Sequence, residues 1–393
     1  MTEHPRVRAP LTWRERAAEV RDGLVQKNLV RQPTVLDSAQ RVDTTINGRR
    51  MVNFSSNDYL GWASDPRQIE WLKEGAARYG VGSGASHWVV GHSQAHEALE
   101  VAICEWLGLE SVALFSTGYM ANLAAISALA EPDVKVHQDR LNHASLLQAG
   151  QLASASRRYP HLDLATLSRR LDTRDQDGFL HLVVTDGVFS MDGNVAPVEA
   201  LVELTAQRNA LLMVDDAHGL GVLGTQGRGS TEGLDVPLVM GTLGKAIGVS
   251  GAFVGGRATW VDWIKQKAKP YTYTTAMSPA LAYVATRAIQ RLQTEPHHQE
   301  TLQKNIRYFR AACEQAGIQL MPSQSAIQPW VVGDNAMAMH FSRQLADQGY
   351  WVGAIRPPTV PQGTARLRIA LSAGHTQSQI SGLVEALKQC AAS

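Results

Sequence analysis

Short apolar runs alternate with helical patterns along the middle of the chain, from about residue 97. The runs typical of buried strands are SVALFS, HLVVTDG, ALLMVDDAHG and PLVMGTLG, and segments between them, such as NLAAISALA, have helical spacing. Strands that alternate with helices form mainly parallel sheets with both faces covered. The pattern therefore predicts an α/β fold whose functional groups lie at the carboxyl ends of the strands.

The pattern changes on both sides of this region. Residues 11–30 are amphipathic and predict a helix, and the dipeptide Asn47-Gly48 predicts a hairpin turn. Beyond residue 280, a long polar helix pattern leads into shorter strands and a last helix, which predicts a smaller α/β domain. The expected units are an N-terminal helix and arm at 1–50, a large domain at 51–280 and a C-terminal domain at 281–393.

Composition limits what the protein does. The chain has 393 residues and a formal net charge of +1, so no overall field favours nucleic acid or an anionic membrane. Cys104, Cys313 and Cys390 form no CxxC pair, which argues against a disulfide framework or a zinc site. No apolar run reaches the roughly 20 residues of a membrane-spanning helix, and no signal sequence is recognisable. We expect a cytoplasmic protein with neither nucleic-acid nor membrane partners.

The chemically distinctive residues follow the predicted strands. Lys245 lies among glycines in GTLGKAIG, where its amine could meet a bulky carbonyl compound, although a surface lysine beside a turn is the simpler interpretation. Asp215 and His218 end ALLMVDDAHG, and the carboxylate could pair with a protonated pyridine nitrogen while the histidine reaches a ring hydroxyl. A helix-capping aspartate and a hydrogen-bonded core histidine explain the same pattern.

Three further segments carry candidate site residues. In STGYMANLAAISA, the amides of Gly118 and Tyr119 would lie at a helix N-terminus and could bind a phosphate, with a tight turn as the alternative. His143 in NHASLL could stack on an aromatic ring, although a capping or core histidine is more usual. Ser190 in GVFSMDG offers a hydroxyl after a strand, for which an ordinary turn serine is the alternative.

Two patterns lack the context that would make them sites. Gly219, Gly221 and Gly224 form GxGxxG after a strand, but the following TQGRGSTEG has no helical periodicity, so we expect no dinucleotide site. His92 and His96 have the i, i+4 spacing of metal ligands on a predicted helix. Because the sequence is not HExxH and no third ligand is evident, we expect no metal.

The order of the segments is more specific than any one of them. Eight short segments occur in a fixed order across nearly the whole chain. They are SNDYLG, GSGAS, STGYMAN, NHASL, GVFSMDG, VDDAHG, TLGK and RLR. In this order the segments resemble the motifs of the α-oxoamine synthase family, whose members are pyridoxal 5'-phosphate (PLP) enzymes of fold type I. The resemblance implies a PLP-dependent transferase fold, a homodimer with shared sites, and an acyltransferase that joins an amino acid to an acyl thioester with loss of carbon dioxide.

The resemblance also implies roles for individual residues. Lys245 would carry PLP and move a proton, Asp215 would keep the pyridine nitrogen protonated, and His143 would stack on the ring. His218 and Ser190 would contact the region of the ring hydroxyl. The phosphate would be bound by Gly118, Tyr119 and Thr242 and, from the second subunit, by Thr274 and Thr275.

The C-terminal segments narrow the expectation within the family. SAIQPWVVGDN and WVGAIRPPTVPQGTARLR resemble members that condense L-alanine with a pimeloyl thioester in biotin biosynthesis. Arg368 would bind the alanine carboxylate through both guanidinium arms, with Arg366 on the same strand face. Arg31, Thr359 and His143 match other substrate-contacting positions. The thioester carrier, acyl carrier protein or coenzyme A, stays open.

Two alternatives stay open as well. Members that use glycine, such as glycine C-acetyltransferase and 5-aminolevulinate synthase, select against one methyl group, which is worth only about 1–3 kcal/mol. A catalytically inactive protein of the same fold is the other alternative, and the retention of Lys245, Asp215 and Arg368 argues against it. Ala85 stands in GSGAS where the family often has glycine and needs a negative φ, and bulky His87-Trp88 follows it, so the acyl preference is open too.

Overall fold

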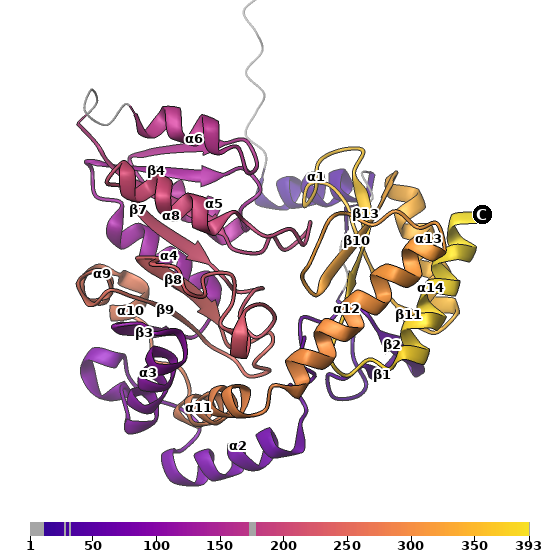
Figure 1. The fold of residues 1–393 in the computed structure, drawn as a ribbon, viewed down its shortest axis with the longest axis horizontal. Helices are drawn as coiled ribbons and strands as arrows, with labels where there is room; N and C mark the ends of the chain where they lie inside the picture. Colours follow the sequence, from indigo (N-terminus) through magenta and orange to yellow (C-terminus); the bar gives the residue numbers. More distant parts are fainter. Residues whose placement is uncertain (1–11, 27–28, 31–32, 173–177, 393) are drawn as a thin grey trace, which may run out of the picture.

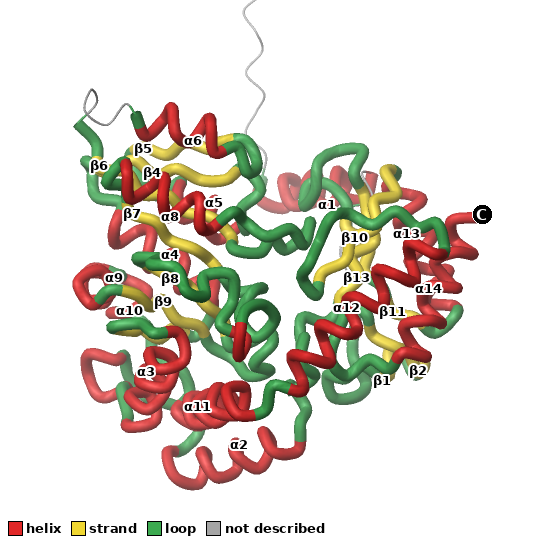
Figure 2. Tube along the Cα trace, viewed as in Figure 1, coloured by secondary structure: helices red, strands yellow, loops and turns green. Residues whose placement is uncertain are grey.

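The computed structural model describes residues 12–26, 29–30, 33–172 and 178–392, which form two halves (Figure 1). The large half is built on a seven-stranded sheet, and the C-terminal half contains two three-stranded sheets. Loops from the large sheet extend into the space between the two halves (Figure 2). The site described below combines these loops with residues of the C-terminal half, such as Arg368 on β13 (Ala365–Ala370).

The large sheet has the strand order β3-β9-β8-β7-β6-β4-β5. Its strands are β3 (Ser111–Phe115), β4 (Val134–Asp139), β5 (Ala155–Tyr159), β6 (Leu180–Asp186), β7 (Leu211–Asp215), β8 (Leu238–Thr242) and β9 (Ala252–Gly256). β9 runs antiparallel to β3 and β8, and the other pairs are parallel. The expected mainly parallel sheet is confirmed.

Helices cover both faces of this sheet. Along β6, Leu182 and Val184 join the apolar core that includes α4 and α9, whereas Val183 joins the core that includes α6 and α8. This alternation follows from the two-residue period of a strand. The helices of the large half are α2 (Pro66–Tyr79), α3 (Gln94–Leu107), α4 (Gly118–Leu129), α5 (Ala144–Gly150), α6 (Leu164–Leu171), α8 (Val198–Gln207), α9 (Ala258–Lys267), α10 (Lys269–Thr272) and α11 (Pro279–Thr294).

The C-terminal half combines the end of the chain with an N-terminal hairpin. The hairpin strands β1 (Asp43–Ile46) and β2 (Arg49–Asn53) join β11 (Tyr350–Trp351), which runs parallel to β2. The second sheet has the antiparallel order β10-β13-β12, formed by β10 (Ile327–Gly333), β13 (Ala365–Ala370) and β12 (Gly353–Ile355). The helices of this half are α1 (Trp13–Gln26), α12 (His297–Gln315), α13 (Asn335–Asp347) and α14 (Gln377–Ala392).

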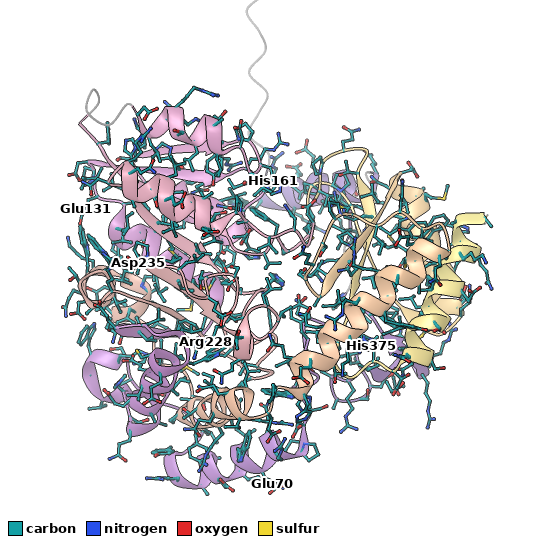
Figure 3. All side chains as sticks on the ribbon, viewed as in Figure 1. Glu70, Glu131, His161, Arg228, Asp235 and His375 are labelled. Atoms are coloured by element: carbon teal, nitrogen blue, oxygen red, sulfur yellow. The ribbon has the colours of Figure 1, made fainter. Side chains whose placement is uncertain are left out.

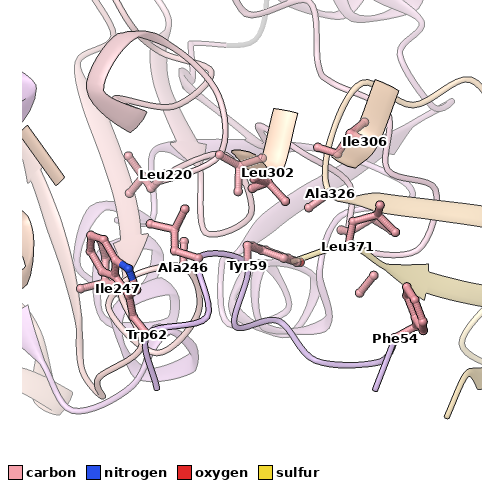
Figure 4. Close-up of a cluster of buried hydrophobic side chains, with 14 of the residues drawn as sticks. Phe54, Tyr59, Trp62, Leu220, Ala246, Ile247, Leu302, Ile306, Ala326 and Leu371 are labelled. Atoms are coloured by element: carbon pink, nitrogen blue, oxygen red, sulfur yellow. The ribbon is translucent and has the colours of Figure 1, made fainter. Parts of the chain in front are cut away.

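A continuous apolar core joins the two halves (Figure 4). Leu220 and Ile247 contribute from the loops after β7 and β8, and Leu371 contributes from the end of β13. Tyr59 lies between these two groups and is fully buried. Burial of this apolar surface therefore fixes the strand ends that carry the site relative to one another.

Several local predictions are confirmed. The hairpin turns at Asn47 and Gly48, whose φ angles of 51° and 72° suit a type I′ turn. The helix expected within 11–30 is α1, and α4 begins at Gly118 as expected. No helix in the described part of the chain is long and apolar enough to cross a membrane. The division into domains at residues 50 and 280 stays a prediction.

Candidate active site

Lys245 lies in the loop after β8 and is half-buried. Burial lowers the pKa of its amine to about 8, against the carboxylates of Asp215 and Asp186, which raise it. An amine with this pKa has a substantial neutral fraction near neutral pH, and only the neutral form acts as a nucleophile or a base. Lys245 therefore has the chemistry of a reactive lysine rather than that of a surface lysine.

Asp215 is the last residue of β7 and is only 4% exposed. Its Oδ2 accepts a hydrogen bond from Asn122 Nδ2 at 2.7 Å, and its Oδ1 accepts from the backbone N–H of Ala217 at 3.1 Å. Both donors are neutral, and no lysine, arginine or histidine of the described residues lies within salt-bridge distance of this carboxylate. The negative charge is thus held in place and is available to a cationic partner in the site.

A partly buried chain of hydrogen bonds connects His218 with Arg368. Nδ1 of His218 lies 2.7 Å from the hydroxyl of Tyr59, and this hydroxyl donates to Asn57 Oδ1 at 3.1 Å. The same Oδ1 accepts from Arg368 Nη2 at 3.2 Å. Burial, with the positive charges of Lys245 and Arg368, lowers the pKa of His218 well below its usual value, so its imidazole is neutral.

His143 directly precedes α5 and caps it. Its Nδ1 lies 2.7 Å from Ser145 Oγ, and its backbone N–H donates to Asp186 Oδ2 at 2.7 Å. The ring is exposed, at a centroid distance of 6.3 Å from that of Tyr119. Desolvation by the surrounding protein still lowers the pKa of His143. The capping interpretation is therefore correct, and it leaves the ring in a position to contact a ligand.

The first turn of α4 offers backbone amides that could bind an anion. Thr117 caps this helix by accepting from Met120 N at 3.3 Å, whereas the amides of Gly118 and Tyr119 donate to no group in the described structure. Gly118 lies close enough to Thr242 that an added Cβ would be 3.8 Å from the threonine Cβ. Free amides and the positive end of a helix dipole together favour a phosphate. Thr274 and Thr275 line a small cavity with Ser116 and Met120 of the same chain, and their expected contact with the phosphate of the second subunit stays a prediction.

The two arginines of β13 differ in their partners. Nη1 of Arg366 donates to Asp192 Oδ1 at 2.8 Å and to the carbonyl of Met191 at 3.2 Å. Nε of Arg368 donates to the carbonyl of Ser190 at 2.6 Å, and no carboxylate among the described residues pairs with this guanidinium. Arg366 is therefore neutralised by the protein, while Arg368 is oriented but keeps its charge for a ligand.

Comparisons with known proteins agree with this geometry. The family model for aminotransferases of class I and II matches residues 49–387. A curated 8-amino-7-oxononanoate synthase from Pseudomonas putida (strain F1) is 50% identical over 369 residues, which cover 92% of this chain and 94% of the relative. The chain belongs to the class I and II aminotransferase family, in its 8-amino-7-oxononanoate synthase branch.

Solved structures show the same fold. A serine palmitoyltransferase from S. paucimobilis, bound to a PLP–myriocin aldimine, has a TM-score of 0.89 at 29% identity and covers 96% of this chain and 97% of its own. An 8-amino-7-oxononanoate synthase from Francisella tularensis has a TM-score of 0.74 at 27% identity, covering 86% of this chain and 97% of its own. The fold expected from the motif order is confirmed.

Other residues singled out in the sequence have varied positions. Arg31 lies outside the described residues, and Thr359 is exposed, with its backbone N–H donating to Arg356 O at 3.1 Å. The carbonyl of Ser190 accepts from Arg368 Nε at 2.6 Å, and the contact expected of its hydroxyl with the cofactor stays a prediction. Ala85 is not among the described residues with positive φ, so alanine fits there without backbone strain.

Four polar residues complete the site and were not predicted from the sequence. Asn57 and Tyr59 belong to SNDYLG, Asn122 ends STGYMAN, and Asp186 ends the strand HLVVTD. Burial and the neighbouring Asp215 raise the pKa of Asp186 well above its usual value. Polar residues inside these ordered segments were the available signal, but their contacts depend on how the two halves pack.

The GxGxxG run packs around a buried aspartate, Asp216. Asp216 accepts from the backbone N–H and the hydroxyl of Ser230, both at 2.7 Å, and burial raises its pKa to about 7. A Cβ added to Gly219 or Gly229 would lie 2.1 or 1.9 Å from its oxygens. The close approach of this side chain therefore requires glycine at 219 and 229, and the run itself forms turns.

The prediction that His92 and His96 share a helix is wrong. α3 begins at Gln94, so His92 precedes the helix. The capping box of α3 uses His96, whose Nδ1 accepts from Ser93 N at 3.0 Å while its Nε2 lies 2.9 Å from the carbonyl of Met277. Both ring nitrogens of His96 thus have partners within the fold.

A different group has metal-ligand spacing in the described part of the chain, namely Glu295, His297 and His298. Both carboxylate oxygens of Glu295 accept from Arg67 at 2.7 Å, and Nε2 of His298 lies 3.0 Å from Arg291 Nη2. Two guanidinium groups therefore already occupy this cluster, and their positive charge opposes a metal ion.

Proposed function

We propose that this protein condenses L-alanine with a pimeloyl thioester to give 8-amino-7-oxononanoate, carbon dioxide and the free thiol of the carrier. The observation that carries the proposal is the meeting of a low-pKa lysine, a buried carboxylate and an unneutralised arginine, Lys245, Asp215 and Arg368, between the two halves. The relatives that share half of its sequence are named for this product.

The residues present fit PLP as the cofactor. The free amides of Gly118 and Tyr119 suit its phosphate, the buried carboxylate of Asp215 suits a protonated pyridine nitrogen, and Lys245 suits its aldehyde carbon. When bound, PLP withdraws electrons from the amino-acid Cα, which makes both loss of the Cα proton and later loss of carbon dioxide easier. His143, whose ring is exposed beside that of Tyr119, would cover one face of the cofactor ring.

Lys245 would move the proton in this reaction. Its amine, with a pKa lowered to about 8, can accept the Cα proton of alanine and return a proton to the product carbon. The new carbon–carbon bond joins alanine Cα to the acyl carbon, and the thiolate leaves with the bonding electrons. The alanine carboxyl group then departs as carbon dioxide, and its bonding electrons return to Cα.

Arg368 would orient the amino acid. Its guanidinium is fixed at Nε by the carbonyl of Ser190 and at Nη2 by Asn57, so its remaining N–H groups can bind a carboxylate in one plane. Arg366 cannot serve equally well because Asp192 already occupies it. This contrast supports the assignment of the alanine carboxylate to Arg368.

We also propose a cytoplasmic homodimer whose sites are shared between subunits. Large apolar side chains are exposed along 81–90 and at Tyr273, which is 81% exposed and adjoins Thr274. Exposed apolar surface of this kind favours association. Mixing Lys245→Ala with a Thr274→Ala/Thr275→Ala double variant should restore activity in heterodimers, and failure to restore any activity would contradict shared sites.

The direct test is mass spectrometry of the product from L-alanine with pimeloyl-coenzyme A or with the pimeloyl ester of acyl carrier protein. We expect 8-amino-7-oxononanoate with at least one carrier and none with Lys245→Ala. Glycine is the competitor to include, because it lacks only the methyl group of alanine. A preference for glycine with a shorter acyl group would replace the proposal by a glycine-using activity.

A further inference from the structure

A half-buried histidine lies outside the site just described. His161 follows β5, and its Nδ1 lies 3.0 and 3.1 Å from the two carboxylate oxygens of Asp139, which is fully buried at the end of β4. Its Nε2 lies 2.8 Å from Asn194 Nδ2. With Nδ1 donating to the carboxylate, Nε2 accepts from the asparagine amide, so the three side chains form one directed chain. In Figure 3, His161 lies on the side of the large half that faces the C-terminal half.

The end of this chain holds a short hairpin, residues 187–196. Asn194 closes it by accepting from Phe189 N at 3.0 Å through its carbonyl, and Gly193 N donates to Phe189 O at 2.8 Å. The ring of His161 also packs edge-on against Phe189, at a centroid distance of 4.4 Å. His161 therefore contacts both ends of the tip of the 187–196 hairpin, once through a hydrogen bond and once through a ring.

The tip of the 187–196 hairpin contacts the C-terminal half. Ser190 O accepts from Arg368 Nε at 2.6 Å, as described above. Gly193 O accepts from Ser323 Oγ at 2.8 Å and from Ser325 Oγ at 3.0 Å. A displacement of the tip would therefore change the orientation of the Arg368 guanidinium, because one carbonyl of the tip fixes its Nε.

We propose that His161 is a positioning residue for the amino-acid substrate. With Asp139 as its anchor, it holds Asn194 and Phe189, and through them the Ser190 carbonyl that sets the plane of the Arg368 guanidinium. A guanidinium binds a carboxylate well only when both forks are aligned, so loss of the anchor weakens alanine binding without removing any group that touches it. This inference rests on the proposed function for its substrate, though not for its structural part.

The kinetic test compares two variants at the same position. His161→Phe keeps the ring contact with Phe189 and removes both hydrogen bonds, whereas His161→Gln keeps one donor and one acceptor. We expect His161→Phe to raise KM for L-alanine about five- to tenfold, the effect of about one hydrogen bond, with little change in kcat or in KM for the thioester. His161→Gln should return KM to within about threefold of the wild type.

A matched control separates positioning from a general loss of stability. Gln299→Leu removes a buried amide that donates to Gly224 O at 2.6 Å, and it does not touch the 187–196 hairpin. It should lower the unfolding temperature and leave KM for alanine unchanged. An unchanged KM in His161→Phe, or an equal rise in Gln299→Leu, would overturn the proposal.

The second test needs no catalysis. In hydrogen–deuterium exchange of the protein without PLP, the amides of Gly193 and Ala196, bonded to Phe189 O and Gly187 O, should exchange faster in His161→Phe and as in wild type in His161→Gln. Asn194→Ser cuts the same chain at its other end and should behave like His161→Phe. Wild-type exchange in both His161→Phe and Asn194→Ser would refute the positioning role. If exchange is faster in these variants but the protein does not use L-alanine as a substrate, only the proposed function is refuted.

Discussion

Replacement of Arg368 by lysine should weaken alanine binding far more than folding. Lysine keeps the charge but loses the bond from Nε to Ser190 O at 2.6 Å and the bond from Nη2 to Asn57 Oδ1 at 3.2 Å, so nothing fixes the orientation of the cation. It also loses the second arm of the carboxylate clamp. A hydrogen bond to a charged group is worth about 1.5–3 kcal/mol, which corresponds to a rise of about ten- to a hundredfold in KM for L-alanine.

The matched control is Arg366→Lys, two residues away on the same strand. Arg366 is 3% exposed and paired with Asp192 at 2.8 Å, and a lysine can keep this ion pair to the 187–196 hairpin, so the replacement should lower the unfolding temperature while KM for alanine changes by less than about threefold. The assay is the initial rate at varied L-alanine and saturating pimeloyl thioester, with thermal unfolding followed in parallel. A large alanine defect in Arg366→Lys and none in Arg368→Lys would show that the carboxylate binds to the other arginine.

Three further outcomes follow from the cited contacts and pKa shifts. Because burial lowers the pKa of Lys245 to about 8, the rate at which PLP attaches to the apoprotein should rise with pH and level off above about 8, and a flat profile from about pH 7 to about 9 would contradict this. Asp215→Asn should reduce kcat at least about a hundredfold with little change in unfolding temperature, and near-normal turnover would rule out its partnership with the pyridine nitrogen. Burial raises the pKa of Asp216 from 3.8 to about 7, so between these values the folded state keeps a proton that the unfolded chain releases. The free energy of unfolding should therefore fall as the pH rises from about 4 to about 7. In thermal unfolding, Asp216→Asn should make this decline less steep, and a slope equal to that of the wild type would refute the assignment.

The parts of the fold that could be predicted are those whose signal is local. β6, β7 and β8 are buried on both faces, and their sequences are continuous apolar runs. β5 (Ala155–Tyr159) lies at the edge of the sheet with exposed arginines, so its sequence ASRRY carries no apolar run. The antiparallel direction of β9 follows from its pairing with both β3 and β8, which no local pattern encodes.

Some residues of the candidate site also have a local sequence signal, and others do not. Lys245 and Asp215 directly follow or end predicted strands, and their order among the motifs pointed to them. The bond between Asn57 and Arg368 joins residues 311 positions apart, and it exists only because the two halves pack on a common core. The same packing makes Asp192 the partner of Arg366, and this contact distinguishes two arginines that the strand pattern alone places on one face.

The proposed reaction forms a carbon–carbon bond at alanine Cα and expels the alanine carboxyl group. The measurement that tests it most directly uses L-alanine labelled with carbon-13 in the carboxyl group, together with a pimeloyl thioester. We expect one labelled carbon dioxide for each molecule of product, an unlabelled 8-amino-7-oxononanoate, and no reaction with Lys245→Ala. Label retained in the product, or product formed without release of labelled carbon dioxide, would rule out this reaction.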